Sequence, residues 1–449
     1  MMRKALGTTS LVFILYFSVS GGPFTTENLV HEIGPGMALL IMLAIPVIWS
    51  IPEALIIGEL ASMLPVEGGY YRWVERAFGP FWAFQNGWLT WMYSLVDMAI
   101  YPLLFNLYLG YFFPGLPTDA QWVVSLAVIW GATAINLRGA VRVGGTSVVA
   151  GTFVVIAFLV AAIGAVHRIS HAPWLPFSAP DAKGLRGLSV GISIALWNYI
   201  GWDNASTVEG EVHDAGRTYP RALAFALPLV TVGYFIPLLA SLGSTDWRTW
   251  QDGGWPEIVR AAVGGGGFGA FVAVWAALAG MISALALFNA LLLSYSRIPF
   301  VMAQDRLLPR AFTTTDARGT PTRAVLVSAV AYSVFVLVPL GRLVVADVVL
   351  YALALGLEFL ALIQLRRTEP ELRGAFRIPV PRSGVIALAS LPIVILVTLV
   401  GLSFRDPDFG FPAICAAAVA VALGPILFGI ARRRALAQAE VPRPASYSG

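Results

Sequence analysis

Apolar runs of roughly 20 residues, each long enough to cross a membrane as a helix, follow one another along this sequence with short polar connections between them. Only 12% of the 449 residues are charged and 58% are hydrophobic, whereas soluble domains contain about 25% charged residues. So few charges cannot cover the water-facing surface of a globular protein. We therefore expect a single polytopic all-α membrane domain of about twelve helices.

Hydropathy and the positions of glycine and proline predict where these spans lie. The expected spans cover residues 7–32, 36–63, 82–112, 120–136, 145–166, 188–210, 221–242, 268–296, 323–340, 344–365, 384–403 and 411–431. An alternative for the first run, preceded by Arg3 and Lys4, is a secretory signal. With a cytoplasmic N-terminus, 22 of the 29 lysines and arginines fall in cytoplasmic segments and none falls in a span. The positive-inside rule then predicts a multi-pass cell-membrane protein with both termini cytoplasmic.

Two of the predicted spans are interrupted by residues that break helices. Gly21, Gly22 and Pro23 interrupt the first span, and the polar stretch 198–204 interrupts the sixth. Proline and paired glycines cannot sustain helical hydrogen bonding, and a broken helix at membrane depth occurs only where its freed backbone groups are buried or line a cavity. Two such breaks indicate inverted repeats with a binding site at the midplane. Alternatively, the glycines only allow close helix packing.

Carboxylates within the predicted spans are the next candidates for function. They are Glu27, Glu53, Glu59, Asp97, Asp203, Glu209 and Glu358. Each costs roughly 2.5 to 3.5 kcal/mol at a helix centre, and without a lysine or arginine in a span, burial favours uptake of a proton. We expect functional roles for Asp97 and Asp203, and pairing with arginine or water for the four glutamates nearer span ends, Glu53, Glu59, Glu209 and Glu358.

Composition also argues against several classes of protein. The net charge of +4 comes from basic residues between apolar runs rather than from a basic patch, so nucleic-acid binding is not expected. Cys415 is the only cysteine, which excludes an intramolecular disulfide and Cys/His metal sites. The four histidines lie near span ends or in loops, so neither a membrane enzyme nor a cofactor is expected. The glycine run 264–267 lacks the Lys-Ser/Thr pair of an ATP-binding loop.

Short motifs follow one another in a fixed order along nearly the whole chain. They occupy residues 20–24 with Glu27, 49–55, 65–70, 78–82, 210–212 with 217–223, 319–321 and 376–379. Together they resemble the signatures of the amino acid/polyamine/organocation transporter superfamily, and more closely those of its polyamine-uptake branch of plants and protozoa. The resemblance implies two inverted five-helix repeats with broken first and sixth helices, plus two extra helices. We place the repeats at about 7–166 and 188–365, the extra helices at about 384–431 and a cytoplasmic tail at 432–449.

The resemblance also implies a substrate site between the broken helices. Main-chain N–H groups of Ser20, Gly21 and Gly22 are expected to meet a substrate carboxylate, and carbonyls near Trp197 and Asn198 to accept from an amine. Gly201, at the sixth-helix break, completes the main-chain part of this site.

Side chains with expected roles lie around that site. Trp197 aligns with the aromatic gate of the family, and Asp97 with a polar third-helix position beside the substrate. Asp203 aligns with an acid linked to proton sensing. Together with Glu27 and Glu53, it forms the set that we assign to proton coupling or gating.

The sequence departs from the family pattern at several positions. The fifth span contains no lysine, although many amino acid members carry one there as a stand-in for sodium. Ser18 stands where plant polyamine members often have an acid. The loop 113–120 has no cysteine for a disulfide-linked heavy chain, so such a partner is not indicated.

The leading hypothesis is a proton-coupled secondary transporter that moves polyamines or amino acids by alternating access. The alternative is an exchanger or symporter for a neutral or cationic amino acid. A passive channel or a non-transporting sensor is the rival from a different class, and concentrative uptake into vesicles separates it from a transporter. The expected partners are the small-molecule substrate, protons and the lipid bilayer.

Overall fold

The computed structural model describes residues 4–179, 184–337, 344–403 and 410–440. The first half of the described chain is built from helices joined by short turns. They are α1 (Thr8–Val19), α2 (Thr26–Ile33), α3 (Pro35–Ile45), the π-helical turn η1 (Pro46–Ser50), α4 (Ile51–Met63), α5 (Gly69–Phe78), α6 (Pro80–Leu109), α7 (Thr118–Asn136) and α8 (Ala140–Val166). No β-strand occurs among the described residues; Leu6 and Val212 form an isolated β-bridge.

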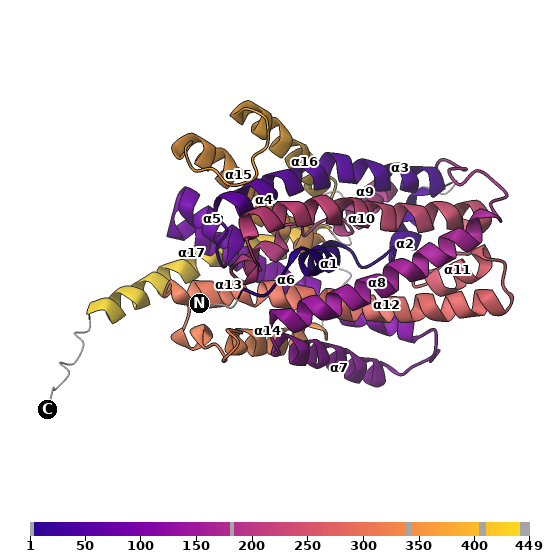
Figure 1. Ribbon diagram of the computed structural model, residues 1–449, viewed down its shortest axis with the longest axis horizontal. Helices are drawn as coiled ribbons and strands as arrows, with labels where there is room; N and C mark the ends of the chain where they lie inside the picture. The colour runs from indigo at the N-terminus through magenta and orange to yellow at the C-terminus, as the bar shows by residue number, and fades with distance from the viewer. Residues whose placement is uncertain (1–3, 180–183, 338–343, 404–409, 441–449) are drawn as a thin grey trace.

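The second half continues in the same way. Its helices are α9 (Gly184–Trp197), the 3-10 helix η2 (Asn204–Glu211), α10 (Ala215–Ser244), η3 (Trp247–Thr249), α11 (Trp255–Ala262), α12 (Gly266–Tyr295), α13 (Arg297–Gln304), η4 (Arg310–Thr313), α14 (Thr322–Phe335), α15 (Val344–Thr368), α16 (Arg382–Ser403) and α17 (Gly410–Glu440). The long helices run side by side along one axis of the molecule (Figure 1).

Seven segments of the described chain are long and apolar enough to cross a membrane. They are Pro35–Met63, Pro80–Leu109, Ala140–Val166, Ala215–Ser244, Gly266–Gln304, Asp347–Thr368 and Ile414–Ala435. Three shorter apolar helices, Thr8–Val19, Thr322–Phe335 and Arg382–Thr398, match the first, ninth and eleventh predicted spans. The remaining predicted spans, 120–136 and 188–210, correspond to α7 and to α9 with η2. The prediction of an all-α membrane protein is confirmed.

The two predicted helix breaks are present. Residues 20–25 separate α1 from α2, and residues 198–203 separate α9 from η2. Around them, α12 packs against α6 and α8, while α1 packs against α8, α10 and α12. This arrangement encloses the short helix α1 within the bundle and so buries the first break.

Some boundaries differ from the predicted ones. The last helix was expected to end at residue 431, but α17 continues to Glu440 through Arg432, Arg433 and Arg434 and projects from one end of the bundle (Figure 1). Arginine is a good helix former, so the charges that end the apolar run do not end the helix. The rest of the predicted tail, 441–449, lies outside the described residues. The repeat boundaries stay a prediction.

Candidate functional site

Both helix breaks depend on glycine. Gly22 has φ +117° and Gly201 has φ +105°, conformations that glycine adopts at little cost. A Cβ atom on Gly201 would lie 2.4 Å from the main-chain oxygen of Ser18. The second break therefore packs against the last turn of α1, directly before the first break, and a side chain at Gly201 would push the two segments apart.

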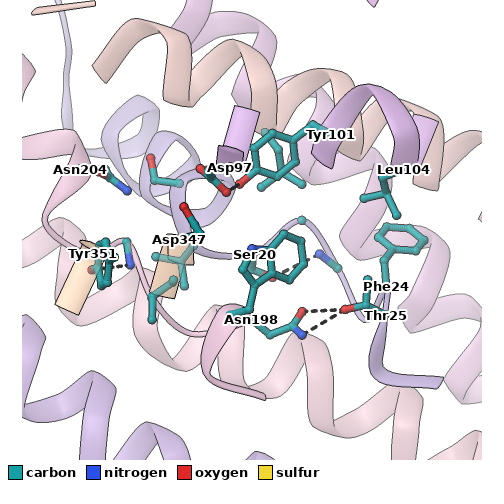
Figure 2. A pocket seen from close by; sticks show the side chains of 18 of the residues that line it. Ser20, Phe24, Thr25, Asp97, Tyr101, Leu104, Asn198, Asn204, Asp347 and Tyr351 are labelled. Carbon is teal, nitrogen blue, oxygen red and sulfur yellow. Dashed lines mark hydrogen bonds between the residues drawn. The ribbon is translucent and has the colours of Figure 1, made fainter. Parts of the chain in front are cut away.

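Hydrogen bonds hold the two breaks in place (Figure 2). Asn198 Nδ2 donates to Thr25 Oγ1 at 3.1 Å, which joins the second break directly to the first. Ser283 on α12 donates from Oγ to the main-chain oxygen of Gly21 at 2.5 Å. Because these bonds link segments far apart in the sequence, the breaks can change shape only if neighbouring helices move as well.

A pocket lies between the breaks. Its described lining includes seven of the ten predicted site residues, namely Ser20, Gly21, Gly22, Asp97, Trp197, Asn198 and Gly201. The free space is about 30 Å³, enough for about two water molecules. A substrate the size of an amino acid or a polyamine can enter only after the surrounding helices move apart.

Asp97 is a buried carboxylate in the wall of this pocket. Tyr101 donates to its Oδ1 at 2.6 Å and Tyr295 donates to its Oδ2 at 3.0 Å. The Trp197 ring stacks on Tyr101, with centroids 6.3 Å apart and planes at 25°. The two hydroxyls fix the orientation of the carboxylate, and the stacked rings form an aromatic wall beside it.

Asp347 is a second pocket carboxylate that the sequence analysis missed. It lies in the first turn of α15 and is 1% exposed, and its Oδ1 has no hydrogen-bond partner among the described residues. Figure 2 shows Asp347 near Asp97, and negative charges on both side chains would repel each other. Leaving a buried carboxylate oxygen unpaired is costly. Its position inside the predicted span 344–365 was the signal that could have identified it.

Tyr351 connects the pocket to two of the predicted proton-coupling residues. Its hydroxyl lies 2.9 Å from Glu53 Oε1 and 2.8 Å from Asp203 Oδ1, and it accepts from the N–H of Gly201 at 2.9 Å. Glu53 Oε1 also accepts from the N–H of Trp202 at 3.1 Å. Glu53 and Asp203 are thus buried behind the pocket wall and do not line the pocket.

Glu27 lies apart from both groups. It is 1% exposed on α2, and its Oε1 accepts from the N–H of Gly253 at 3.0 Å. Gly253 belongs to the connection that leads into α11, at the end of the bundle where α2 also lies (Figure 1). The structure therefore does not bring Glu27 together with Asp203 and Glu53.

The expected pairing of the other intramembrane glutamates holds at one position. Arg366 forms a bidentate ion pair with Glu59, with N–O distances of 2.7 and 2.5 Å. Glu53 contacts Tyr351 and Glu358 lies 3.5 Å from Asn86 Nδ2, so neither has a described contact with an arginine, and pairing with water stays a prediction for both. Glu209 is buried, and neither of its carboxylate oxygens has a hydrogen-bond partner among the described residues.

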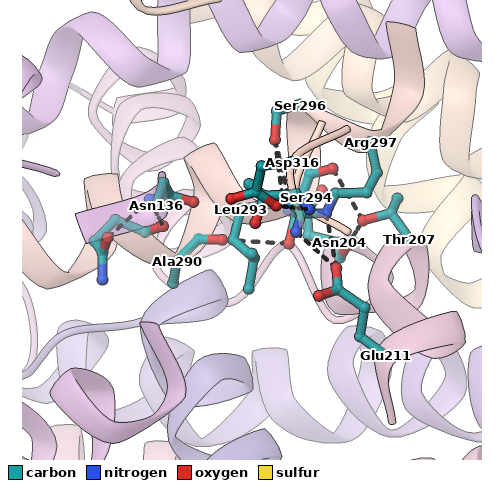
Figure 3. A network of polar contacts seen from close by, with 12 residues as sticks. Asn136, Asn204, Thr207, Glu211, Ala290, Leu293, Ser294, Ser296, Arg297 and Asp316 are labelled. Carbon is teal, nitrogen blue, oxygen red and sulfur yellow. Dashed lines mark hydrogen bonds and ion pairs between the residues drawn. The ribbon is translucent and has the colours of Figure 1, made fainter. Parts of the chain in front are cut away.

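One arginine directly after a predicted span, Arg297, is enclosed by protein. Arg297 begins α13, inside the apolar segment Gly266–Gln304, and is fully buried. Its Nη2 lies 2.6 Å from Glu211 Oε1, and Nη1 donates to the main-chain oxygen of Leu293 (Figure 3). The sequence places Arg297 next to a span end, and only the packing of η2 against α12 and α13 shows that it is enclosed.

No group of three or more His, Cys, Asp and Glu side chains in the described chain is placed to hold a metal ion. The pocket lining named by the structure also includes no lysine or arginine. The described lining can therefore offer a ligand carboxyl groups, tyrosine hydroxyls, main-chain groups at the two breaks and aromatic surface.

Comparison with known proteins adds an independent observation. The family model described as amino acid permease matches residues 6–423. The polyamine transporter PUT1 of Oryza sativa subsp. japonica is 34% identical over 405 residues, covering 89% of this chain and 74% of the relative. The probable polyamine transporter At3g19553 of Arabidopsis thaliana is 39% identical over 395 residues, covering 87% and 80%. The branched-chain amino acid permease BcaP of Lactococcus lactis subsp. cremoris (strain MG1363) is 25% identical over 342 residues, covering 72% and 71%.

Proposed function

This chain belongs to the amino acid permease family, and on that premise we propose that it is a proton-coupled secondary transporter of polyamines. Its relatives are named as transporters or permeases rather than enzymes. Transport of a polyamine or an amino acid across a membrane is therefore the broad function.

The pair of buried pocket carboxylates carries the proposal of a cationic substrate. Asp97 and Asp347 place two carboxyl groups at the pocket, and its described lining contains no lysine or arginine to pair with them. A substrate ammonium group would supply the missing positive charge and could donate to the unpartnered Oδ1 of Asp347. A diamine carries two such groups, whereas a neutral amino acid carries one ammonium and one carboxylate that the two aspartates would repel.

An amino acid remains the second candidate because of the main chain at the breaks. Gly21, Gly22 and Gly201 all line the pocket, and exposed main-chain N–H groups at a helix break can bind a carboxylate. This arrangement suits a zwitterion whose carboxylate lies at the first break and whose ammonium lies near Asp97.

Hydrogen-bond counting around Tyr351 supports proton coupling. The hydroxyl has one proton to donate but faces two carboxylate oxygens, on Glu53 and Asp203. It also receives the N–H of Gly201, which leaves one lone pair free. All contacts are satisfied when one carboxyl group is protonated and donates to that lone pair, because two buried carboxylates with like charge repel. The group therefore suits binding and release of one proton beside the substrate pocket.

The small free space in the pocket supports alternating access. In this conformation, the bond between Thr25 and Asn198 joins the two breaks, and the pocket has room only for water. A transporter must alternate between forms that open the site to each side of the membrane. We place both termini in the cytoplasm of a cell-membrane protein, since the basic residues favour that orientation.

Uptake of radiolabelled putrescine into proteoliposomes tests the proposal. We expect putrescine to accumulate above its external concentration under an inward proton gradient, and a protonophore to abolish the accumulation. Accumulation of leucine but not putrescine would favour the amino acid alternative. Accumulation that survives the protonophore and requires sodium would overturn the proton coupling, and equilibration without accumulation would indicate a channel.

A further inference from the structure

A second, larger cavity shares no lining residue with the substrate pocket. It has a volume of about 410 Å³, within the range of about 300 to 1,000 Å³ typical of ligand sites. Its walls come from α6, α13, α14, the 306–312 segment and the last turns of α17. These elements lie at the end of the bundle from which α17 projects (Figure 1). We call this cavity the α17 groove.

Apolar side chains form most of the α17 groove. Trp88 and Trp91 line it from α6, Met302 from α13 and Leu427 from α17. Trp88 Nε1 donates to the main-chain oxygen of Ala420 at 2.7 Å, which fixes α6 against α17. The groove is thus bounded by helices that contact each other, and its surface suits a hydrocarbon chain.

Positive charge is concentrated at the same groove. Arg306, Arg310 and Arg434 line it, and its described lining contains no aspartate or glutamate. The nearest acid in the sequence is Asp305. Its Oδ2 lies 2.8 Å from Nη1 of Arg72, so Asp305 forms an ion pair with Arg72, which does not line the groove. All three groove arginines are exposed, and arginine binds phosphate groups well.

Arg306 lies two residues after the end of α13 and has an unusual backbone conformation. Arg306 has φ +64°, a left-handed conformation that is uncommon for residues other than glycine, asparagine and aspartate. A ligand that combines an anionic phosphate with an acyl chain would complement both the arginines and the apolar walls of the groove.

The depth of the groove in the membrane fits the same ligand. It begins along the apolar segment Ile414–Ala435, of which only 17% is buried within the protein, and ends at the basic residues of α17. Such a transition from apolar to basic surface marks the level where lipid headgroups lie. We propose that the α17 groove binds one anionic phospholipid, with its phosphate at Arg306, Arg310 and Arg434 and an acyl chain along Trp88 and Leu427.

Native mass spectrometry in neutral detergent tests this site with phosphatidylglycerol and with phosphatidylcholine of identical acyl chains. The variant R306Q/R310Q/R434Q should bind phosphatidylglycerol about 10-fold to 100-fold more weakly, because each arginine near a lipid surface adds to the attraction for anionic lipid. Phosphatidylcholine binding should be unchanged. The control R323Q/R432Q/R433Q loses the same charge from exposed arginines outside the groove and should bind phosphatidylglycerol like the parent protein.

A second variant tests the apolar part. Ala431→Trp fills the groove, whereas Ala418→Trp places the same ring on an exposed position of α17 outside it. Only the first should reduce retention of phosphatidylglycerol. Equal loss in both charge variants, equal loss in both tryptophan variants, or competition by soluble glycerol phosphate at equal concentration would overturn the proposal. Since lipid binding is measured without transport, the outcome is independent of the proposed substrate and coupling.

Discussion

Replacing Asp347 by asparagine removes one of the two carboxyl groups at the substrate pocket and keeps the shape of the side chain. A hydrogen bond to a charged group contributes about 1.5 to 3 kcal/mol, which corresponds to about 10-fold to 150-fold in Kd. We therefore expect Asp347→Asn to weaken putrescine binding within that range. Asp97→Asn should weaken it less, because Tyr101 and Tyr295 already donate to both Asp97 oxygens, whereas Asp347 Oδ1 is unpartnered among the described residues.

The same substitution should not lower the stability of the empty protein. A buried carboxylate oxygen without a partner disfavours the folded state, and Asp347 Oδ1 is such an atom among the described residues, so the melting temperature of Asp347→Asn should equal or exceed that of the parent. Higher stability together with weaker binding is typical of a residue kept for function.

Isothermal titration with putrescine and with leucine measures the effect. Asp119→Asn, at an exposed position in the first turn of α7, is the matched control and should bind like the parent. Equal putrescine affinity in the parent and in Asp347→Asn would refute the assignment of the two aspartates to a cationic substrate. Weaker leucine binding in Asp347→Asn, with putrescine unaffected, would refute it as well.

Four further predictions follow from other parts of the structure. Trp197→Ala should weaken substrate retention but keep the protein folded; loss of the monodisperse form on size-exclusion chromatography would instead make this ring structural. Tyr351→Phe should abolish proton-driven accumulation in proteoliposomes while putrescine exchange continues, and unchanged accumulation would contradict the shared-proton argument. Arg297→Met should destabilise the protein by about 3 to 5 kcal/mol, because it leaves Glu211 buried without its partner, and Arg297→Met with Glu211→Leu should recover much of the loss in a thermal-unfolding assay. Burial, with repulsion from Glu211, raises the pKa of Glu67 in the loop before α5 to about 8. The stabilisation that comes from the protonated Glu67 carboxyl should be complete below about pH 4.5 and lost as the pH rises through 8. The melting temperature of Glu67→Gln should therefore vary less with pH over that range than the melting temperature of the parent.

The sequence alone determined the membrane architecture and both helix breaks. Apolar runs of span length allow few structures other than helices. The residues at 21–23 and 198–204 disrupt helical hydrogen bonding locally, so each break can be predicted from a short stretch of sequence. Asp97 could be predicted for the same reason, since a mid-span carboxylate stands out in any apolar run. Seven of the ten predicted site residues line the pocket because the two breaks and α6 meet there.

Other features of the site were decided only by the tertiary structure. Tyr351 meets Glu53 and Asp203 across 298 and 148 residues of sequence, and Arg297 meets Glu211 across 86. Hydropathy identifies a polar group within an apolar run, but it does not specify which helix faces that group. Asp347 was missed although it lies inside a predicted span, Glu27 was grouped with the central site, and Arg297 was counted as a cytoplasmic charge. Their surroundings depend on how the helices rotate and pack, and packing depends on contacts between helices distant in the chain.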